Sequence, residues 1–196
     1  GSFYPSDLPT AKMLPYYAAR FSTVEINYTF YRMPTEKVLA NWAKATPDGF
    51  AFTLKASRRI THDARLRDCK ELVETFCARA HTLGDKLGVL LFQLPPWSRK
   101  DLDVLNAFLD WVLSSIRAAF EFRHDSWHSD DVFDSLRAKN LALCITDSEK
   151  RTAPMVMTAD YAYFRLRDEG YQEADIVQWG DKIAEHTSDR GDVFVY

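Results

Sequence analysis

Short apolar runs alternate with longer amphipathic runs along most of the chain, and this alternation constrains the fold more than any other feature. Seven runs are typical of β-strands, at residues 23–30, 50–56, 87–95, 118–124, 141–148, 160–167 and 192–196. Helical periodicity occupies residues 35–45, 68–83, 101–113, 130–140 and 175–187. A helix after most strands predicts βαβ units and a parallel sheet. The exception is the segment 149–159, which is too short and irregular for a crossover helix.

Two parallel architectures fit this pattern. A doubly wound sheet normally carries a glycine-rich turn after an early strand, whereas this chain has seven glycines and no Gly-x-Gly-x-x-Gly motif. A (β/α)8 barrel needs no such turn. We therefore predict an α/β fold of the TIM-type (β/α)8 class, with about seven of the eight parallel strands visible. We expect one domain that covers residues 1–196.

Composition narrows the classes of function. The net charge of −3 and the isoelectric point of about 6.0 argue against a broad nucleic-acid-binding surface, but not against a local basic pocket. Cys69, Cys77 and Cys144 form no Cys-x-x-Cys pair, which fits a reducing compartment. No apolar run approaches the ~20 residues that cross a bilayer, and the opening residues are typical of a loop rather than a signal peptide. We expect a cytoplasmic protein without a membrane or nucleic-acid partner. The sequence does not predict its oligomeric state.

Polar side chains recur at alternate positions of the predicted strands. In a barrel, alternate side chains point into the interior and toward the helices. We assign the polar positions to the interior, because the opposite positions, such as Val24, Phe52 and Phe122, are apolar. The last interior residues of six strands are then all polar, namely Asn27, Lys55, Gln93, Arg123, Asp147 and Arg165. They fall at the carboxyl ends of the strands, where barrel enzymes build their active sites.

The charges at these positions allow two interpretations. Three of the six residues are cationic and only Asp147 is anionic, while Glu25 and Glu121 lie one layer deeper. Because buried charges must be paired, three cations and three carboxylates could form a self-neutralising network. Alternatively, the cations at the rim bind a phosphate or carboxylate group, which arginine recognises with two parallel hydrogen bonds.

Further candidates lie in the segments that follow strands. His62 follows the strand 50–56 and has the ordinary pKa of a general acid or base, or it packs within its loop. His124 and Trp127 follow the strand 118–124, and either line a pocket or pack in the loop above the barrel.

Five motifs, in chain order, resemble those of a known family. They are VEINYTFYRMP, PDGFAFTLKASRRITH, KLGVLLFQLPP, FEFRHDSW and TADYAYFRLR. On these motifs the chain resembles the YecE-like family (domain of unknown function 72) over about residues 1–196. The resemblance implies a TIM barrel but no established activity. It places characteristic polar positions at Glu25, Asn27, Lys55, His62, Gln93, Glu121, Arg123, His124, Asp147 and Arg165.

The chain departs from the family pattern in two respects. Family members usually have a further strand with an Ile-Gly-Thr-Ser-Gly-Trp-like motif before the Gly-Ser-Phe-Tyr-Pro element, and a last helix after the position of Tyr196. We therefore expect an open barrel that lacks the first strand and last helix, with residues 23–30 and 192–196 as exposed edges. The His-Gly pair that often follows the family's seventh strand is Arg167-Asp168 here, so we expect no catalytic histidine at that position.

The favoured hypothesis is an enzyme that acts on a small anionic metabolite at the carboxyl ends of the strands. Glu121 or Asp147 would be the general base and His62 the general acid. The remaining residues of the site would bind substrate, namely Lys55, Arg123 and Arg165 for the anion, with Glu25, Asn27, Gln93, His124 and Trp127 around it. Both hydrolysis and a reaction through an enolate fit these residues.

Two alternatives stay open. One is a non-catalytic ligand-binding or scaffold protein in which the polar interior is structural. The other is a metal-dependent phosphodiester or sugar enzyme with Glu25, Glu121 and Asp147 as ligands, since hard cations take carboxylate oxygens. Three nearby cations make metal binding unfavourable, so we predict no cofactor. A divalent metal is considered only as part of this last alternative.

Overall fold

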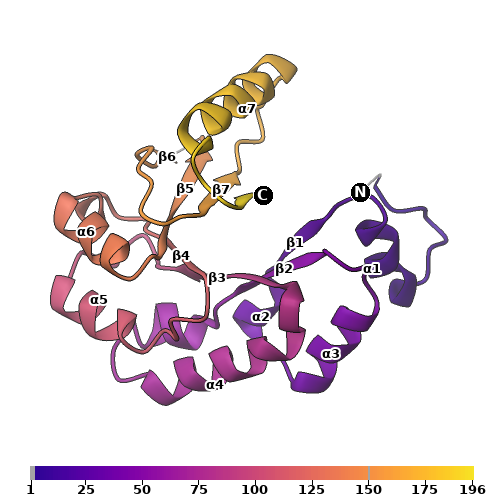
Figure 1. Cartoon of the computed structure of the whole chain (residues 1–196), viewed down its shortest axis with the longest axis horizontal. Coiled ribbons are helices and arrows are strands. Elements are labelled where there is room, and N and C mark those ends of the chain that lie inside the picture. Colours follow the sequence, from indigo (N-terminus) through magenta and orange to yellow (C-terminus); the bar gives the residue numbers. More distant parts are fainter. Residues whose placement is uncertain (1–2, 150) are drawn as a thin grey trace.

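The computed structural model describes residues 3–149 and 151–196 and contains one strongly curved sheet (Figure 1). Among these residues, seven parallel strands pair in the order β1-β2-β3-β4-β5-β7-β8. Their bounds are Thr23–Ile26 (β1), Ala51–Lys55 (β2), Leu87–Gln93 (β3), Ala118–Glu121 (β4), Ala142–Ser148 (β5), Ala162–Leu166 (β7) and Val193–Val195 (β8). The short strand β6 (Arg151–Thr152) pairs antiparallel with β5. The arrangement is a nearly closed barrel, which confirms the predicted TIM-type fold.

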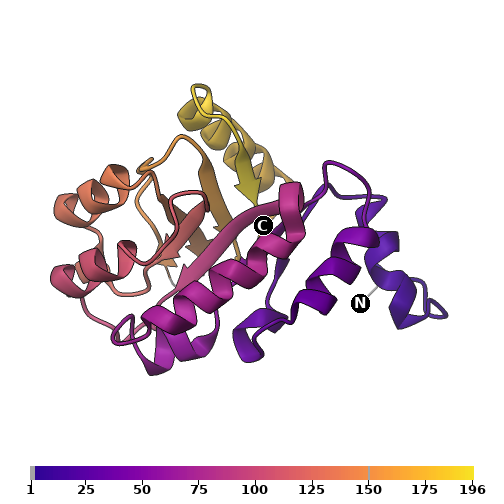
Figure 2. The same cartoon turned by 60° about the horizontal axis from the view of Figure 1, so that its bottom comes forward.

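Helices cover the outer side of this sheet (Figures 1 and 2). The α-helices are Thr10–Ala18 (α1), Tyr28–Tyr31 (α2), Glu36–Lys44 (α3), Lys70–Ala80 (α4), Leu102–Leu109 (α5), Asp130–Ala138 (α6) and Glu173–Thr187 (α7). Three shorter helical segments are Arg59–Asp63 (η1), His81–Lys86 (η2) and Asp125–Trp127 (η3). No helix among the described residues has both the length and the apolar character needed to cross a membrane.

Among the described residues, the strands build three apolar clusters, two on the outer face and one inside the barrel. Outward side chains such as Phe52, Phe92 and Phe120 are fully buried against α3 to α6. Inward side chains such as Leu91 and Tyr163 form a smaller cluster inside the barrel. The predicted alternation is therefore correct for β2, β3 and β4, and the polar side chains at their carboxyl ends share the interior.

The alternation predicted for residues 141–148 is wrong by one position. Ala142 and Cys144 belong to the interior cluster, so Asp147 lies on the opposite face of β5. There its carboxylate accepts hydrogen bonds from Tyr171 and Trp179 on the α7 side of the sheet. The prediction relied on the charge of Asp147 to identify the interior positions. Both sets of alternate positions in this strand end in polar residues, so that signal was ambiguous.

One segment near the amino terminus also differs from prediction. The strand predicted at residues 23–30 ends at Ile26, and residues 28–31 turn into α2. The Thr29 hydroxyl stabilises this turn by donating to the carbonyl oxygens of Ile26 and Lys55, at 3.0 and 2.6 Å. The opening residues, expected to be a loop, have no helix or strand in their described part, residues 3–9, and α1 follows from Thr10.

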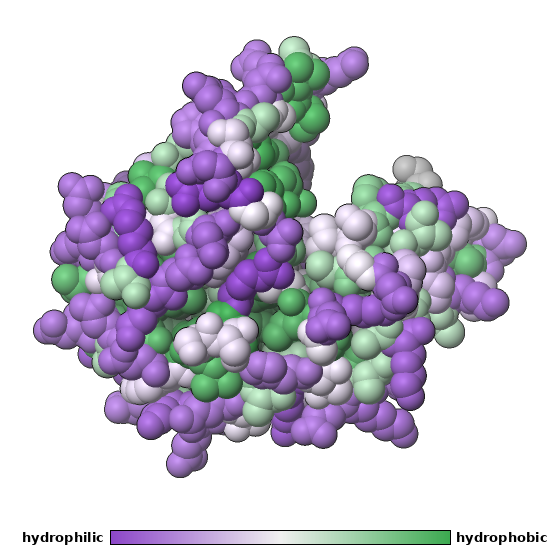
Figure 3. Space-filling view, in the orientation of Figure 1, coloured by the Kyte–Doolittle hydropathy of each residue, from purple (hydrophilic) through white to green (hydrophobic). Residues whose placement is uncertain are grey.

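Strands β1 and β8 end the sheet on either side, which confirms the predicted edges. The Tyr196 hydroxyl spans the opening between them, with its oxygen 2.6 Å from Thr23 Oγ1 and 3.0 Å from Thr53 Oγ1. The molecular surface has a notch between α7 and the N-terminal segment (Figure 3). Side chains of β8 and β1 thus meet across the barrel opening although their backbones do not pair.

Candidate functional site

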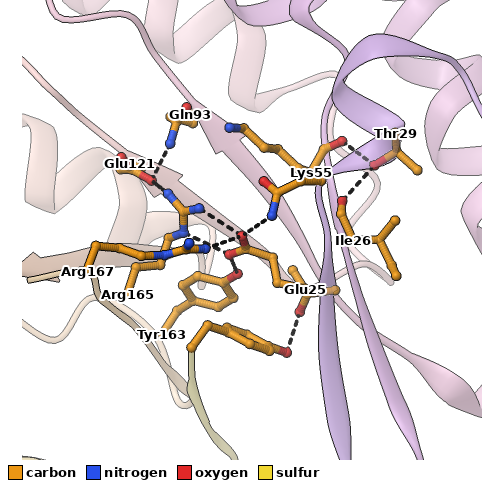
Figure 4. A network of polar contacts seen from close by, with 12 residues as sticks. Glu25, Ile26, Thr29, Lys55, Gln93, Glu121, Tyr163, Arg165 and Arg167 are labelled. Atoms are coloured by element: carbon orange, nitrogen blue, oxygen red, sulfur yellow. Dashed lines mark hydrogen bonds and ion pairs between the residues drawn. The ribbon is translucent and has the colours of Figure 1, made fainter. Parts of the chain in front are cut away.

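Polar side chains from four strands meet inside the barrel near the carboxyl ends (Figure 4). We call Glu25, Gln93, Glu121, Tyr163 and Arg165 the inner network. Arg165 is its centre, because its guanidinium donates two hydrogen bonds of 2.8 Å to Glu25 and a further one to Glu121 Oε2. The side chains of Arg165, Glu25 and Glu121 are 6%, 3% and 3% exposed. Both buried carboxylates therefore depend on one guanidinium.

Glu121 accepts hydrogen bonds on both carboxylate oxygens. Besides Arg165, its donors are Gln93 Nε2 at 2.8 Å and Arg123 Nε at 2.7 Å. Burial alone would raise the pKa of Glu121, but the charges of Arg165 and Arg123 and the Gln93 hydrogen bond together lower it. A carboxylate so strongly held in its charged form is a poor proton acceptor, which weakens the predicted general-base role of Glu121.

Glu25 is held in a similar way. The Tyr163 hydroxyl donates to its Oε2 at 2.7 Å, and Arg167 and Asn27 donate to its Oε1 at 3.2 and 3.1 Å. Burial and the nearby Glu25 carboxylate raise the pKa of Tyr163 well above its ordinary value. Tyr163 thus serves as a neutral hydrogen-bond donor. Asn27 is exposed and is linked to the inner network by its hydrogen bond to Glu25.

Three further cations surround the inner network, and we call Lys55, Arg123 and Arg167 the outer cations. The side chains of Arg123 and Arg167 are 43% and 51% exposed, and each reaches a single carboxylate of the inner network. Lys55 is half-buried at the end of β2 and has no hydrogen bond or ion pair from its ammonium within the described chain. Its Nζ lies 4.4 Å from the centre of the Phe30 ring. Burial, followed by the charge of Arg165, lowers the pKa of Lys55 to about 8.

The charges of the inner network and the outer cations do not balance. Four cations surround two carboxylates, so the site keeps an excess of two positive charges when Lys55 is protonated. The predicted set of three cations and three carboxylates would have balanced. The excess arises because the Asp147 carboxylate is bound by Tyr171 and Trp179 instead, and because Arg167 joins the site. The alternation that identified Arg165 would have identified Arg167 had it been continued by two residues.

A cavity of about 360 Å³ opens beside the three arginines of the site. Its lining residues are Pro96, Glu121, Arg123, Thr146, Asp147, Ser148, Arg165 and Arg167. The cavity has room for a small metabolite, and its charged walls come from β4, β5 and β7 and the residues that follow them.

Asp147 lines this cavity but its carboxylate is engaged elsewhere. Oδ1 accepts from Thr152 at 2.6 Å, and Oδ2 accepts from Tyr171 at 2.7 Å and Trp179 at 3.1 Å. Burial would raise the pKa of Asp147, but these three hydrogen bonds lower it. Asp147 therefore fastens β6 and the α7 region to β5, and its predicted role as a general base has no support from its contacts.

His62 lies in η1, close to the outer cations. Its ring packs edge-to-face against Phe30 and Trp97, with ring centres 4.9 and 6.2 Å away. Burial, followed by the charge of Lys55 and then of Arg123, lowers the pKa of His62, so the imidazole is neutral at neutral pH. His62 thus belongs to the site although it lies outside the strands, where the alternation of side chains makes no prediction.

His124 and Trp127 have mainly structural contacts. His124 Nδ1 accepts from the backbone N–H of Ser126 at 3.2 Å and caps η3. Trp127 is 2% exposed, stacks on Phe122 with ring centres 4.7 Å apart, and donates from Nε1 to the Ser98 carbonyl. Both hold the segment after β4 in place.

The carboxylates considered as metal ligands are not brought together. Glu25 and Glu121 are joined by Arg165, while the Asp147 carboxylate faces α7. In the part of the chain that the structure describes, no group of three or more His, Cys, Asp or Glu side chains is arranged to hold a metal ion.

These features define a TIM-type barrel with an excess of positive charge at the carboxyl ends of its strands. The chain belongs to the family described as protein of unknown function DUF72, whose model matches residues 1–196. This agrees with the resemblance of its motifs to the YecE-like family.

Two relatives support this membership. The UPF0759 protein YecE of Escherichia coli (strain K12) is 36% identical over 109 residues, which cover 55% of this chain and 40% of YecE. The UPF0759 protein YunF of Bacillus subtilis (strain 168) is 34% identical over 145 residues, which cover 68% of this chain and 50% of YunF. The chain thus spans half or less of the length of these curated relatives.

Solved structures show the same fold. A DUF72 family protein of Thermotoga maritima MSB8 superposes with a TM-score of 0.86 at 26% identity, covering 100% of this chain and 85% of the other. A DUF72 family protein of Enterococcus faecalis V583 superposes with a TM-score of 0.81 at 20% identity, covering 94% and 85%.

Proposed function

We propose that this protein is an enzyme that binds a small phosphate- or carboxylate-bearing metabolite at the carboxyl ends of its barrel strands. The observation that carries the proposal is the excess of two positive charges beside the 360 Å³ cavity. Uncompensated cations in a partly buried site are costly unless an anion neutralises them.

The two exposed arginines are suited to hold such an anion. Arg123 contacts Glu121 through Nε, and Arg167 contacts Glu25 through Nη2, so each guanidinium has further N–H donors. Both arginines line the cavity. Arginine binds phosphate and carboxylate groups through pairs of parallel N–H donors. Lys55 adds a point charge on the β2 side.

The groups best placed for proton transfer differ from those first predicted. Glu121 and Asp147 are saturated with hydrogen bonds, whereas His62 and Lys55 are the titratable groups whose pKa values move toward or below neutrality. General acid–base catalysis is most effective when the pKa lies near the working pH. We therefore assign proton transfer to His62 and Lys55.

Thermal unfolding with inorganic phosphate and simple carboxylates tests the anion site. A ligand at 100 times its Kd stabilises the native state by about 2.7 kcal/mol. We expect such stabilisation for the unmodified protein and a loss of most of it in Arg123→Gln. Arg137→Gln is the matched control, because Arg137 is an exposed arginine on α6 that pairs with Asp134, away from the inner network. Equal stabilisation of all three proteins, or of none, would refute the anion site.

The hydrogen-bonded inner network also favours a second candidate, a binding protein without catalysis. Such a protein would show the same anion stabilisation but no turnover with any phosphorylated or carboxylated compound. Replacement of His62 by Gln separates the two, because it should abolish turnover in an enzyme and leave anion binding nearly unchanged.

A further inference from the structure

Lys55 differs from the other cations of the site in its contacts. Arg123, Arg165 and Arg167 all donate to Glu25 or Glu121, whereas the Lys55 ammonium donates to neither within the described chain. Figure 4 shows its side chain extending from β2 toward Gln93 and Glu121. Its backbone is fixed, since the carbonyl oxygen accepts the 2.6 Å hydrogen bond from Thr29.

Lys55 also differs in chemistry. A guanidinium stays protonated and is no nucleophile, whereas a lysine amine becomes nucleophilic once it loses its proton. Burial and neighbouring cations favour that loss, as they do at lysines that react with carbonyl groups. With a pKa of about 8, roughly a tenth of the Lys55 side chains are neutral at pH 7. An ordinary exposed lysine is neutral about two hundred times less often.

We propose that Lys55 forms an imine with the carbonyl carbon of an anionic aldehyde or ketone, while Arg123 and Arg167 hold its phosphate or carboxylate group. The geometry supports this, because Lys55 lies at the carboxyl end of a barrel strand and has no ion pair within the described chain. Its side chain extends toward Glu121, which lines the cavity together with Arg123 and Arg167 (Figure 4). The inference rests on the proposed function and names the substrate class as 2-oxo acids and phosphorylated aldehydes or ketones.

The chemical step balances with the groups present. The neutral amine of Lys55 attacks the carbonyl carbon, the C–N bond forms, and the carbonyl oxygen takes up a proton to give a carbinolamine. Loss of the hydroxyl as water, with the nitrogen lone pair closing the C=N bond, gives the imine. His62, neutral and close enough to feel the charge of Lys55, carries the two nitrogen protons to the oxygen in turn. The first forms the hydroxyl of the carbinolamine, and the second converts that hydroxyl to the departing water.

Borohydride trapping tests the proposal. The protein would be incubated with pyruvate or with glycolaldehyde phosphate, reduced with sodium borohydride, and analysed by intact-mass and peptide mass spectrometry. Hydride adds to the imine carbon and leaves a stable secondary amine. We expect one adduct on Lys55, formed at least tenfold faster than with the uncharged glycolaldehyde. Lys55→Met should abolish it, and Lys37→Met, which changes an exposed lysine of α3, should retain it.

Lys55→Arg provides a second variant that keeps the positive charge in case the methionine variant unfolds. The Arg variant should still be stabilised by inorganic phosphate but should form no adduct. If phosphate stabilises the unmodified protein and no adduct forms on Lys55, the imine is refuted while the anion site stands. If adducts spread evenly over exposed lysines such as Lys37, the imine is refuted as well. If phosphate fails to stabilise the protein, the proposed function itself fails.

Discussion

The inner network and the outer cations lie at the same end of the barrel but differ in how far their charges are satisfied. In the inner network, Arg165 serves two carboxylates and all three side chains are almost completely buried. Among the outer cations, Arg123 and Arg167 are about half exposed and reach one carboxylate each. Lys55 reaches no carboxylate in the part of the chain that the structure describes.

This difference predicts that the inner network contributes to the stability of the fold and the outer cations to ligand binding. A buried, fully hydrogen-bonded ion network loses several kcal/mol when one partner is removed, whereas exposed ion pairs contribute little. The inner network should therefore hold the strand ends together, and the outer cations should be nearly dispensable for folding but required for a ligand. The following predictions test that separation, in order of expected effect.

The largest effect is expected for Arg165→Met, which leaves Glu25 and Glu121 buried without their shared cation. We expect a loss of ~3–5 kcal/mol in the free energy of unfolding. Arg123→Gln, the matched change in an exposed guanidinium, should cost less than ~1 kcal/mol. Urea unfolding at neutral pH measures both. Similar losses in the two variants would mean that the inner network and the outer cations form one structural unit.

A smaller effect is expected for Tyr163→Phe. The change removes the 2.7 Å hydrogen bond to Glu25 Oε2 and leaves Arg165 as the donor to that oxygen. Loss of one buried hydrogen bond to a charged group should lower the free energy of unfolding by ~1–3 kcal/mol. An unchanged stability would show that the tyrosine hydroxyl is dispensable.

The smallest effect concerns pH and Lys55. The pKa of Lys55 is lowered from 10.5 to about 8 in the folded state, so between these values the unfolded chain holds a proton that the folded chain has lost. The contribution of Lys55 to the free energy of unfolding therefore rises as pH increases from about 8 to 10.5. Below pH 8 the buried charge of Lys55 destabilises the folded state. Lys55→Met should be more stable at pH 7, on the order of 1 kcal/mol, and this advantage should shrink toward pH 10.5. Urea unfolding of both proteins across this range measures it, and a pH-independent difference would contradict it.

Much of the inner network could be predicted from the sequence because its strands have one strictly apolar set of alternate positions. In β3 and β4, Phe92 and Phe120 identify the outer face without ambiguity, so Gln93 and Glu121 must point inward. The same argument failed in β5, where polar residues end both sets of positions and Asp147 points to α7.

Other parts of the site depend on contacts distant in sequence. No local pattern indicates that Thr29 would end β1 by donating a hydrogen bond to the carbonyl oxygen of Lys55, 26 residues away. The position of His62 depends on η1 and on packing against Phe30 and Trp97, which no strand periodicity encodes. Charge alone could not tell a saturated carboxylate such as Glu121 from a reactive one, since that distinction depends on the number of donors around it.

The most direct test of the binding role of the outer cations is to locate a bound anion. Crystals soaked in tungstate, an oxyanion with a shape similar to that of phosphate, would reveal its position by anomalous scattering. We predict a tungsten peak in the cavity, in contact with Arg123 and Arg167 and on the side facing Lys55, with the inner network unchanged. A cavity without tungsten, in crystals that hold tungstate on other surfaces, would contradict the account.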